Sequence, residues 1–220
     1  MNAAAQAAGT AGHAATLARI EQGLRMVTVP FPHLCGLVGA TRVTIEPRLP
    51  TMGVFASGRL AVNPDFVRKL NDADLMFVLA HEMLHLALRT HDRAKGSGRL
   101  EFNYAHDYII NDLLRAELGR ATVPANGLDM PGAKEKSAEE IVLEMRRRQD
   151  KRATRTRVWD GTPGAPGAGE EDGDVLSDAR ERELYPGEAD AAKARREQLR
   201  ALAAKALALA EAMGALNGAR

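Results

Sequence analysis

The chain contains 220 residues, which is enough for one domain with a hydrophobic core and too few for two large domains. Its formal net charge is only +1, so it lacks the strong positive charge by which many proteins bind nucleic acids or membrane surfaces. The single cysteine, Cys35, excludes an internal disulfide framework and suits a reducing compartment.

The N-terminal segment, residues 1–14, is rich in alanine and lacks the basic start and the continuous apolar stretch of a secretory signal. We interpret it as a flexible leader. An amphipathic helix follows, because Leu17, Ile20 and Leu24 recur at helical spacing. We therefore expect a soluble, cytoplasmic protein with no nucleic-acid or membrane partner.

Short strands are predicted next. Residues 41–47 and 59–64 alternate apolar and polar side chains and are rich in β-branched residues, which is typical of half-buried strands. The stretch 52–58 lies between them and contains two glycines, so we expect two or three antiparallel strands. Pro64 cannot donate a hydrogen bond to a sheet and ends the last strand.

Helices dominate the following segment. Residues 63–90 predict a short helix and then a long one, for which Asn71 or Asp72 is the N-cap. The long helix is apolar on all sides between residues 75 and 80, which indicates burial on every face. Residues 100–119 predict another helix, closed by a glycine. The expected fold class is α+β, mainly helical with a small antiparallel sheet before the long helix.

The C-terminal third changes in composition. Ser137 and Glu140 have the spacing of a capping box and predict a helix start, but the segment beyond residue 150 is rich in glycine and proline and then acidic. A last Ala-rich segment predicts a helix whose apolar run is too short and too charged to span a membrane. The expected parts are a flexible leader (1–14), a main domain (15–150), a mobile linker (151–187) and a C-terminal helix (188–214).

The long helix carries a His-Glu-x-x-His pattern at His81, Glu82 and His85. The two histidines are four residues apart, so their imidazoles lie on one face of the helix and can converge on one zinc ion. Glu82 is rotated by about 100° from His81, toward a water molecule on that ion. The zinc would acidify this water, Glu82 would take its proton, and the water would attack a peptide carbonyl. Burial favours a metal site over two core histidines, because a buried glutamate is costly without a partner.

A catalytic zinc ion usually has a third protein ligand, and His91 is one candidate. It completes the His-Glu-x-x-His-x-x-Gly-x-x-His spacing of metzincins, with Met130 in the place of their Met-turn. However, Leu88 replaces the glycine at which the metzincin helix breaks. His91 would therefore reach the ion only if the helix ended by about residue 89.

Asp107 is the other candidate, and we favour it. The connection between the two helices is short, so they should be antiparallel neighbours, and an inward carboxylate can then face the histidines. Asn103 and Asn111 share the helix face of Asp107 and could orient the ligands by hydrogen bonds. His106 points elsewhere on this helix and is interpreted as a substrate-side or surface histidine.

Three ordered blocks resemble the bacterial putative metallopeptidase domain family, which often precedes a von Willebrand factor A-like domain. They are FASGRLAVNPDFVRKLNDADLMFVLAHEMLHLALRTHDR (55–93), FNYAHDYIINDLL (102–114) and VPANGLDMPGAKEKSAEEI (123–141). The resemblance implies a zincin-like fold, in which His81 and His85 lie on the active-site helix and Asp107 is an acidic ligand on the next helix. It also implies a gene neighbourhood with MoxR-type AAA ATPases.

The resulting hypothesis is a zinc-dependent peptidase with one Zn²⁺ on His81, His85 and Asp107, acting on a peptide or protein substrate. The segment RLAVN (59–63) is expected to be an edge strand that pairs with the substrate. Candidates for stabilising an oxyanion are Tyr104, Tyr108, His91 and His106. The rival hypothesis is a non-catalytic, zinc-stabilised helical adaptor that works with an AAA ATPase or a von Willebrand factor A-like partner.

Overall fold

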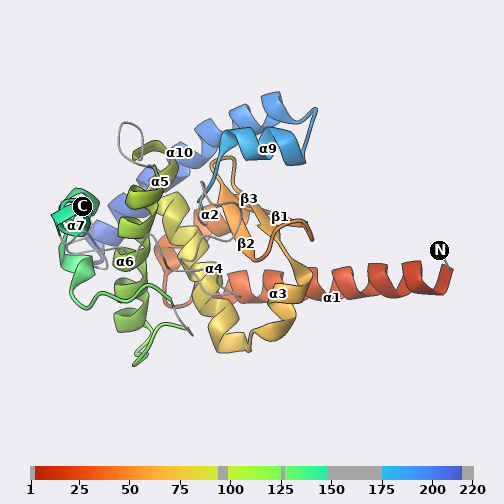
Figure 1. Ribbon diagram of the computed structural model, residues 1–220, viewed down its shortest axis with the longest axis horizontal. Helices are drawn as coiled ribbons and strands as arrows, with labels where there is room; N and C mark the ends of the chain where they lie inside the picture. Colours follow the sequence, from red (N-terminus) through yellow and green to blue (C-terminus); the bar gives the residue numbers. More distant parts are fainter. Residues whose placement is uncertain (1–2, 94–98, 125–126, 148–174, 215–220) are drawn as a thin grey trace.

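The computed structural model describes residues 3–93, 99–124, 127–147 and 175–214 of the chain (Figure 1). Helices surround a small four-stranded sheet, so the α+β class is confirmed. The helical elements are α1 (Ala3–Val27), η1 (Pro32–Leu34), α2 (Cys35–Ala40), α3 (Pro64–Lys69), α4 (Asp72–Ala87), α5 (Thr90–Arg93), α6 (Arg99–Glu117), η2 (Ala133–Glu135), α7 (Ala138–Arg147), α9 (Asp178–Leu184) and α10 (Ala189–Ala212). The strands are β1 (Arg42–Ile45), β2 (Met52–Phe55), β3 (Arg59–Val62) and β4 (Val175–Leu176).

The sheet is mixed, so the prediction of a purely antiparallel sheet is wrong. Its order is β1-β3-β2-β4. Only the β2–β3 pair is antiparallel, joined by a tight turn in which Gly58 has φ 76° and donates its N–H to the carbonyl of Phe55 at 2.8 Å. β1 crosses to the far side of β3 and runs parallel to it. Alternation of side chains identifies a strand but does not specify its neighbour or direction.

Strand β3 lies inside the sheet rather than at its edge. It pairs with β1 on one side and with β2 on the other, and all four of its residues are buried. The expectation that RLAVN (59–63) is an edge strand open to a substrate is therefore wrong. Both edges of this sheet are other strands, β1 and β4.

Strand β4 and helix α9 come from residues 175–187, which we expected to belong to a mobile linker. Val175 pairs with Val54, and Leu176 pairs with Phe55. Ser177 then caps α9, because its hydroxyl accepts a hydrogen bond from the backbone N–H of Arg180 at 3.1 Å. The acidic, glycine-rich composition before this short strand concealed it. The first part of the expected linker, 151–174, lies outside the described residues.

Helix α4 is the central element and positions the candidate site. It lies between α6 on one side and the sheet on the other (Figure 1), and from Phe77 to Ala87 every residue is buried. Its start is as expected, because the Asn71 side chain accepts a hydrogen bond from the N–H of Asp74 at 2.8 Å. Helix α1 packs closely against it at Gly23, where an added Cβ would lie 2.5 Å from the Leu79 side chain.

Helix α1 is longer than expected. It begins at Ala3, within the segment interpreted as a flexible leader, and its N-terminal half projects beyond the rest of the molecule (Figure 1). Alanine has the highest intrinsic helix propensity, which explains why the helix continues through this Ala-rich segment. Within the described ranges, no helix combines the length and apolar character needed to cross a membrane.

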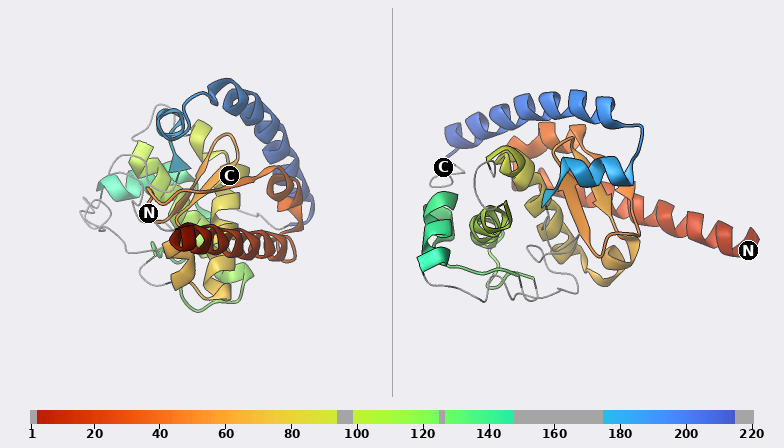
Figure 2. Two further views of the ribbon diagram at one scale, coloured as in Figure 1. Left: turned by 90° about the vertical axis from the view of Figure 1, so that its right-hand side faces the viewer. Right: turned by 45° about the horizontal axis from the view of Figure 1, so that its top comes forward.

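The C-terminal helix α10 packs along one side of the molecule, with α9 folded back beneath it (Figure 2). It is tied to α5 through Asp92, whose carboxylate accepts two hydrogen bonds from Arg200 (2.9 and 2.6 Å) and one from Arg196 (3.0 Å). Burial raises the pKa of Asp92, but Arg200, Arg89 and Arg196 lower it by more, to well below its usual range. Helix α10 therefore holds α5, the short helix that follows α4, in place.

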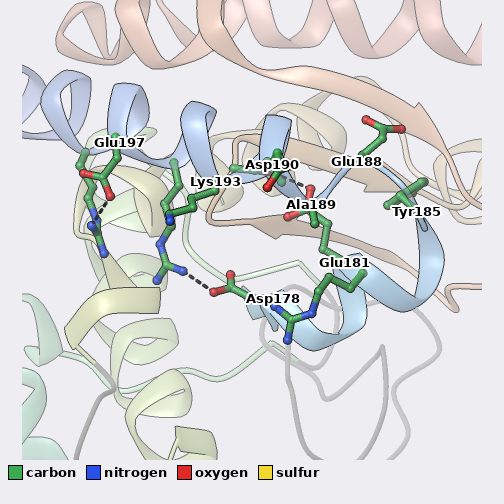
Figure 3. Close-up of a pocket in the computed structure, with 13 residues that line it drawn as sticks. Asp178, Glu181, Tyr185, Glu188, Ala189, Asp190, Lys193 and Glu197 are labelled. Carbon is green, nitrogen blue, oxygen red and sulfur yellow. Dashed lines mark hydrogen bonds and ion pairs between the residues drawn. The ribbon is translucent and has the colours of Figure 1, made fainter.

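A pocket of about 390 Å³ lies between α9 and α10 (Figure 3). Acidic and basic side chains both line it, and Arg196 of α10 bonds to Asp178 of α9. The His-Glu-x-x-His residues and Asp107 do not line this pocket. The ion pair in this pocket joins α9 to α10. The candidate metal site lies elsewhere.

Candidate metal centre

The two histidines of the pattern converge as their spacing predicts. His81 and His85 lie one turn apart on α4, and their Nε2 atoms are 2.8 Å apart. Their rings meet edge to face at a centroid distance of 4.5 Å. Neither side chain is exposed to solvent. Both Nε2 atoms therefore face the same small volume inside the protein.

Asp107 of α6 completes a group of three. Its Oδ1 atom lies 3.0 Å from Nε2 of His85 and 3.6 Å from Nε2 of His81. A tetrahedral zinc ion with ligands at ~2.0–2.1 Å separates neighbouring ligand atoms by about 3.3 Å, which is close to these three separations. His81, His85 and Asp107 could thus hold a metal ion.

The tautomer of His81 is fixed by a chain of hydrogen bonds. The Asn111 side-chain N–H donates to the backbone carbonyl of Leu128 at 3.0 Å, so its Oδ1 is left as an acceptor. That Oδ1 lies 2.9 Å from Nδ1 of His81, which must therefore carry the hydrogen. With its ring hydrogen on Nδ1, His81 presents Nε2 toward Asp107 and His85.

His85 and Asp107 also have supporting contacts. Nδ1 of His85 lies 3.0 Å from the hydroxyl of Thr90, a buried residue at the start of α5. Asn103 donates to the second carboxylate oxygen of Asp107 at 3.2 Å. Asn103 and Asn111 thus contact Asp107 and His81, as their shared helix face led us to expect. The contact of Thr90 with His85 was not anticipated.

The charge of the side chains around the two Nε2 atoms and Asp107 favours a cation between them. Burial and then the neighbouring His81 lower the pKa of His85 to about 4. Burial raises the pKa of Asp107, but the facing imidazoles of His85 and His81 lower it by more, so it stays below its usual value. At neutral pH an uncharged His85 and the Asp107 carboxylate therefore face the imidazole of His81. Once the Nδ1 atom of His85 donates to Thr90, three electron-pair donors face each other.

The donor set restricts the kind of ion. Two imidazole nitrogens and one carboxylate oxygen suit Zn²⁺ and related divalent transition metals, whereas Ca²⁺ and Mg²⁺ prefer oxygen ligands. Three protein ligands leave at least one coordination position for water or substrate. The residues present therefore fit a single zinc-like ion.

Glu82 follows His81 on α4 and is 1% exposed. It lies on the same buried helix as the two histidines, in the position from which the His-Glu-x-x-His pattern predicts a general base. Tyr104 and Tyr108 of α6 are also buried. Glu82 thus shares α4 with His81 and His85, whereas Tyr104 and Tyr108 belong to the apolar cluster that includes residues of α7.

His91 is not part of this group. The α4 helix ends at Ala87, and Arg89 adopts a left-handed conformation with φ 55°, so the helix breaks even though Leu88 is not glycine. His91 nevertheless turns to the sheet, where its Nε2 lies 3.1 Å from the carbonyl oxygen of Val54. The sequence argument against His91 assumed an unbroken helix, which is wrong, and the direction of the side chain now separates it from the site.

Met130 and His106 also differ from their expected surroundings. Met130 packs against the apolar cluster between α6 and α7, which is ordinary core packing. His106 is 1% exposed, so it is neither a surface histidine nor a group on an open substrate face. Its Nδ1 lies 2.6 Å from the Thr90 hydroxyl. No spacing along one helix could reveal this contact, because it joins α5 to α6.

One comparison with known proteins, the match to a family model, is in keeping with this site. A family model described as "Putative metallopeptidase domain" matches residues 18–219, which includes α9 and α10 as well as the helices of the site. Searches of curated proteins and of solved structures found no significant match. The family description suggests a metal-dependent hydrolase, in keeping with the cluster of His81, His85 and Asp107. The chain therefore belongs to the putative metallopeptidase domain family.

Proposed function

We propose that this protein is a zinc-dependent metallohydrolase that cleaves peptide bonds, with a zincin-like arrangement of its active-site helix. The convergence of two imidazole nitrogens and one carboxylate oxygen in a fully buried site carries this proposal. The family description supports it independently.

His81, His85 and Asp107 would hold the ion, and Asn111, Thr90 and Asn103 orient them. Zinc held there would lower the pKa of a water molecule to near neutrality and polarise a carbonyl group. Glu82 would accept the proton of that water and return it to the departing amine. Tyr104 and Tyr108 stay candidates for stabilising the oxyanion, whereas His91 contacts the carbonyl of Val54 and His106 contacts the hydroxyl of Thr90.

The burial of the site also supports a second candidate function. His81, His85 and Asp107 have no solvent exposure, and closed zinc sites are usually structural. On this reading the protein is a zinc-stabilised adaptor for an AAA ATPase or a von Willebrand factor A-like partner. We favour the hydrolase, because structural zinc sites usually have four protein ligands and the described residues supply three. A hydrolase requires a local opening that admits the peptide.

Glu82→Gln distinguishes the two functions. The amide keeps the size of the side chain but cannot accept a proton, so a peptidase would keep its zinc and lose cleavage by at least about 100-fold. Cleavage of a labelled, denatured protein and zinc content would be measured on the same samples. The matched control is Glu117→Gln, an exposed position on α6. Equal cleavage by wild type and Glu82→Gln would refute the catalytic role, and a zinc-loaded wild type without any cleavage would favour the adaptor.

A further inference from the structure

The Thr90 hydroxyl lies between two histidines from different helices. Its Oγ1 is 3.0 Å from Nδ1 of His85 on α4 and 2.6 Å from Nδ1 of His106 on α6. The three residues are all buried, and each is at most 1% exposed. The ring of Phe102 lies against His106 with a centroid distance of 4.8 Å, which restricts the orientation of that imidazole.

A hydroxyl has one hydrogen, so Thr90 can donate to only one of the two Nδ1 atoms. If it donates to His85, the hydrogen of neutral His85 sits on Nε2, where it blocks the lone pair that faces Asp107. If it donates to His106, it can accept a hydrogen from Nδ1 of His85, and Nε2 of His85 is then free to bind a metal. The direction of this one hydrogen bond decides whether His85 can be a ligand.

We infer that His106 is a positioning residue for the metal centre: its Nδ1 accepts the Thr90 hydrogen and thereby selects the metal-binding tautomer of His85. This inference rests on the proposed zinc site and adds to it a residue that does not touch the ion. His81 has a fixed partner in Asn111, which can only accept from its Nδ1. His85 has a partner, Thr90, that could act in either direction, and a His106 ring with its hydrogen on Nε2 would decide that direction.

Two substitutions at position 106 separate this role from simple packing. His106→Leu removes the acceptor, so the Thr90 hydroxyl is left with Nδ1 of His85 as its partner and stabilises the wrong tautomer. We expect about 10- to 100-fold weaker zinc binding, the usual effect of losing such a supporting contact. In His106→Asn the side-chain oxygen can replace Nδ1 as the acceptor, and this variant should recover most of the lost affinity.

Zinc affinity would be measured by competition with a chromogenic chelator, alongside thermal unfolding of each metal-free variant. His13→Leu, at an exposed position on α1, is the control for the loss of a histidine. Equal affinity of wild type and His106→Leu would overturn the inference, and so would a His106→Asn variant as weak as His106→Leu. A wild type that binds no zinc would overturn the proposed metal centre as well.

A second experiment observes the ring tautomers of His85 and His106 directly. It uses the wild-type protein, so its result does not depend on whether a variant folds. In zinc-loaded protein with ¹⁵N-labelled histidines, two-bond ¹⁵N–¹H spectra report which ring nitrogen carries the hydrogen. We expect His85 with hydrogen on Nδ1 and His106 with hydrogen on Nε2. A His106 ring with its hydrogen on Nδ1 would contradict the inference, even if zinc binds normally.

Discussion

Asn111 accepts a hydrogen bond from His81 at Nδ1, over a distance of 2.9 Å, on the opposite side of the imidazole from the nitrogen that faces Asp107. The asparagine is itself held by the carbonyl of Leu128. This contact fixes the orientation of the His81 ring and places the ring hydrogen on Nδ1, so Nε2 faces Asp107. The candidate metal centre thus depends on contacts between α4 and α6 as well as on the His-Glu-x-x-His pattern.

Asn111→Leu should therefore weaken zinc binding by about 10- to 100-fold, because His81 loses the acceptor that fixes its tautomer. Chelator competition measures this change. Asn111→Asp is the matched variant: a carboxylate still accepts from Nδ1 of His81 but cannot donate to Leu128. It should bind zinc more tightly than Asn111→Leu. If the two variants and wild type had the same affinity, Asn111 would have no part in the site.

The stability of the metal-free protein should depend on pH. The folded-state pKa of His85 is about 4, below the ordinary value of 6.5, so between these values the unfolded chain binds the proton more readily. The free energy of unfolding must then fall as the pH falls through this window, by about 2 kcal/mol from pH 7 to pH 5 for this one residue. The pKa of buried His106 is also lowered, which adds to the same slope.

Urea unfolding of the chelator-treated protein at pH 7, 6 and 5 measures this dependence. His85→Asn should show a shallower slope, because its side chain does not titrate. A free energy of unfolding that stayed constant over this range would be inconsistent with a neutral, buried His85.

Arg59 should be essential for attaching α9 to the sheet. Its side chain is 2% exposed, bonds to Glu181 of α9 at 3.2 Å and stacks 3.8 Å over the ring of Tyr185. Arg59→Met leaves the buried Glu181 carboxylate without this partner, so we expect a loss of about 3–5 kcal/mol in unfolding free energy. Denaturant unfolding measures it, and Glu181→Leu added to Arg59→Met should restore part of the loss.

Arg68→Met is the control for removing a surface arginine. Arg68 pairs with Asp65 where both side chains are more than half exposed, and such pairs contribute less than about 1 kcal/mol. A loss in Arg59→Met no larger than in Arg68→Met would show that the buried ion pair does not stabilise the fold.

Much of the site could be predicted from helical spacing. His81 and His85 are four residues apart, and Asn103, Asp107 and Asn111 repeat at the same interval, so each set shares one face of a helix. The relation between the two helices followed from their short connection. These are local properties, which a single sequence records directly.

The features that the sequence did not reveal are non-local. The parallel pairing of β1 with β3, and of β4 with β2, joins segments whose direction no alternation pattern encodes. Helix α4 ends at Ala87 and is followed by the left-handed Arg89, although position 88 is leucine and not the glycine at which a metzincin helix breaks. The contact of Thr90 with His106 depends on how α5 is placed against α6, and α5 in turn is held by α10.

The most direct test of the metal centre is the zinc content of Asp107→Ala beside that of His91→Ala, with folding of both checked by circular dichroism. Asp107 faces both histidines of the pattern, whereas His91 contacts the carbonyl of Val54. We predict that wild type and His91→Ala each bind one zinc ion per chain and that folded Asp107→Ala loses it. Loss of zinc in His91→Ala, with zinc retained in Asp107→Ala, would contradict the ligand set proposed for this protein.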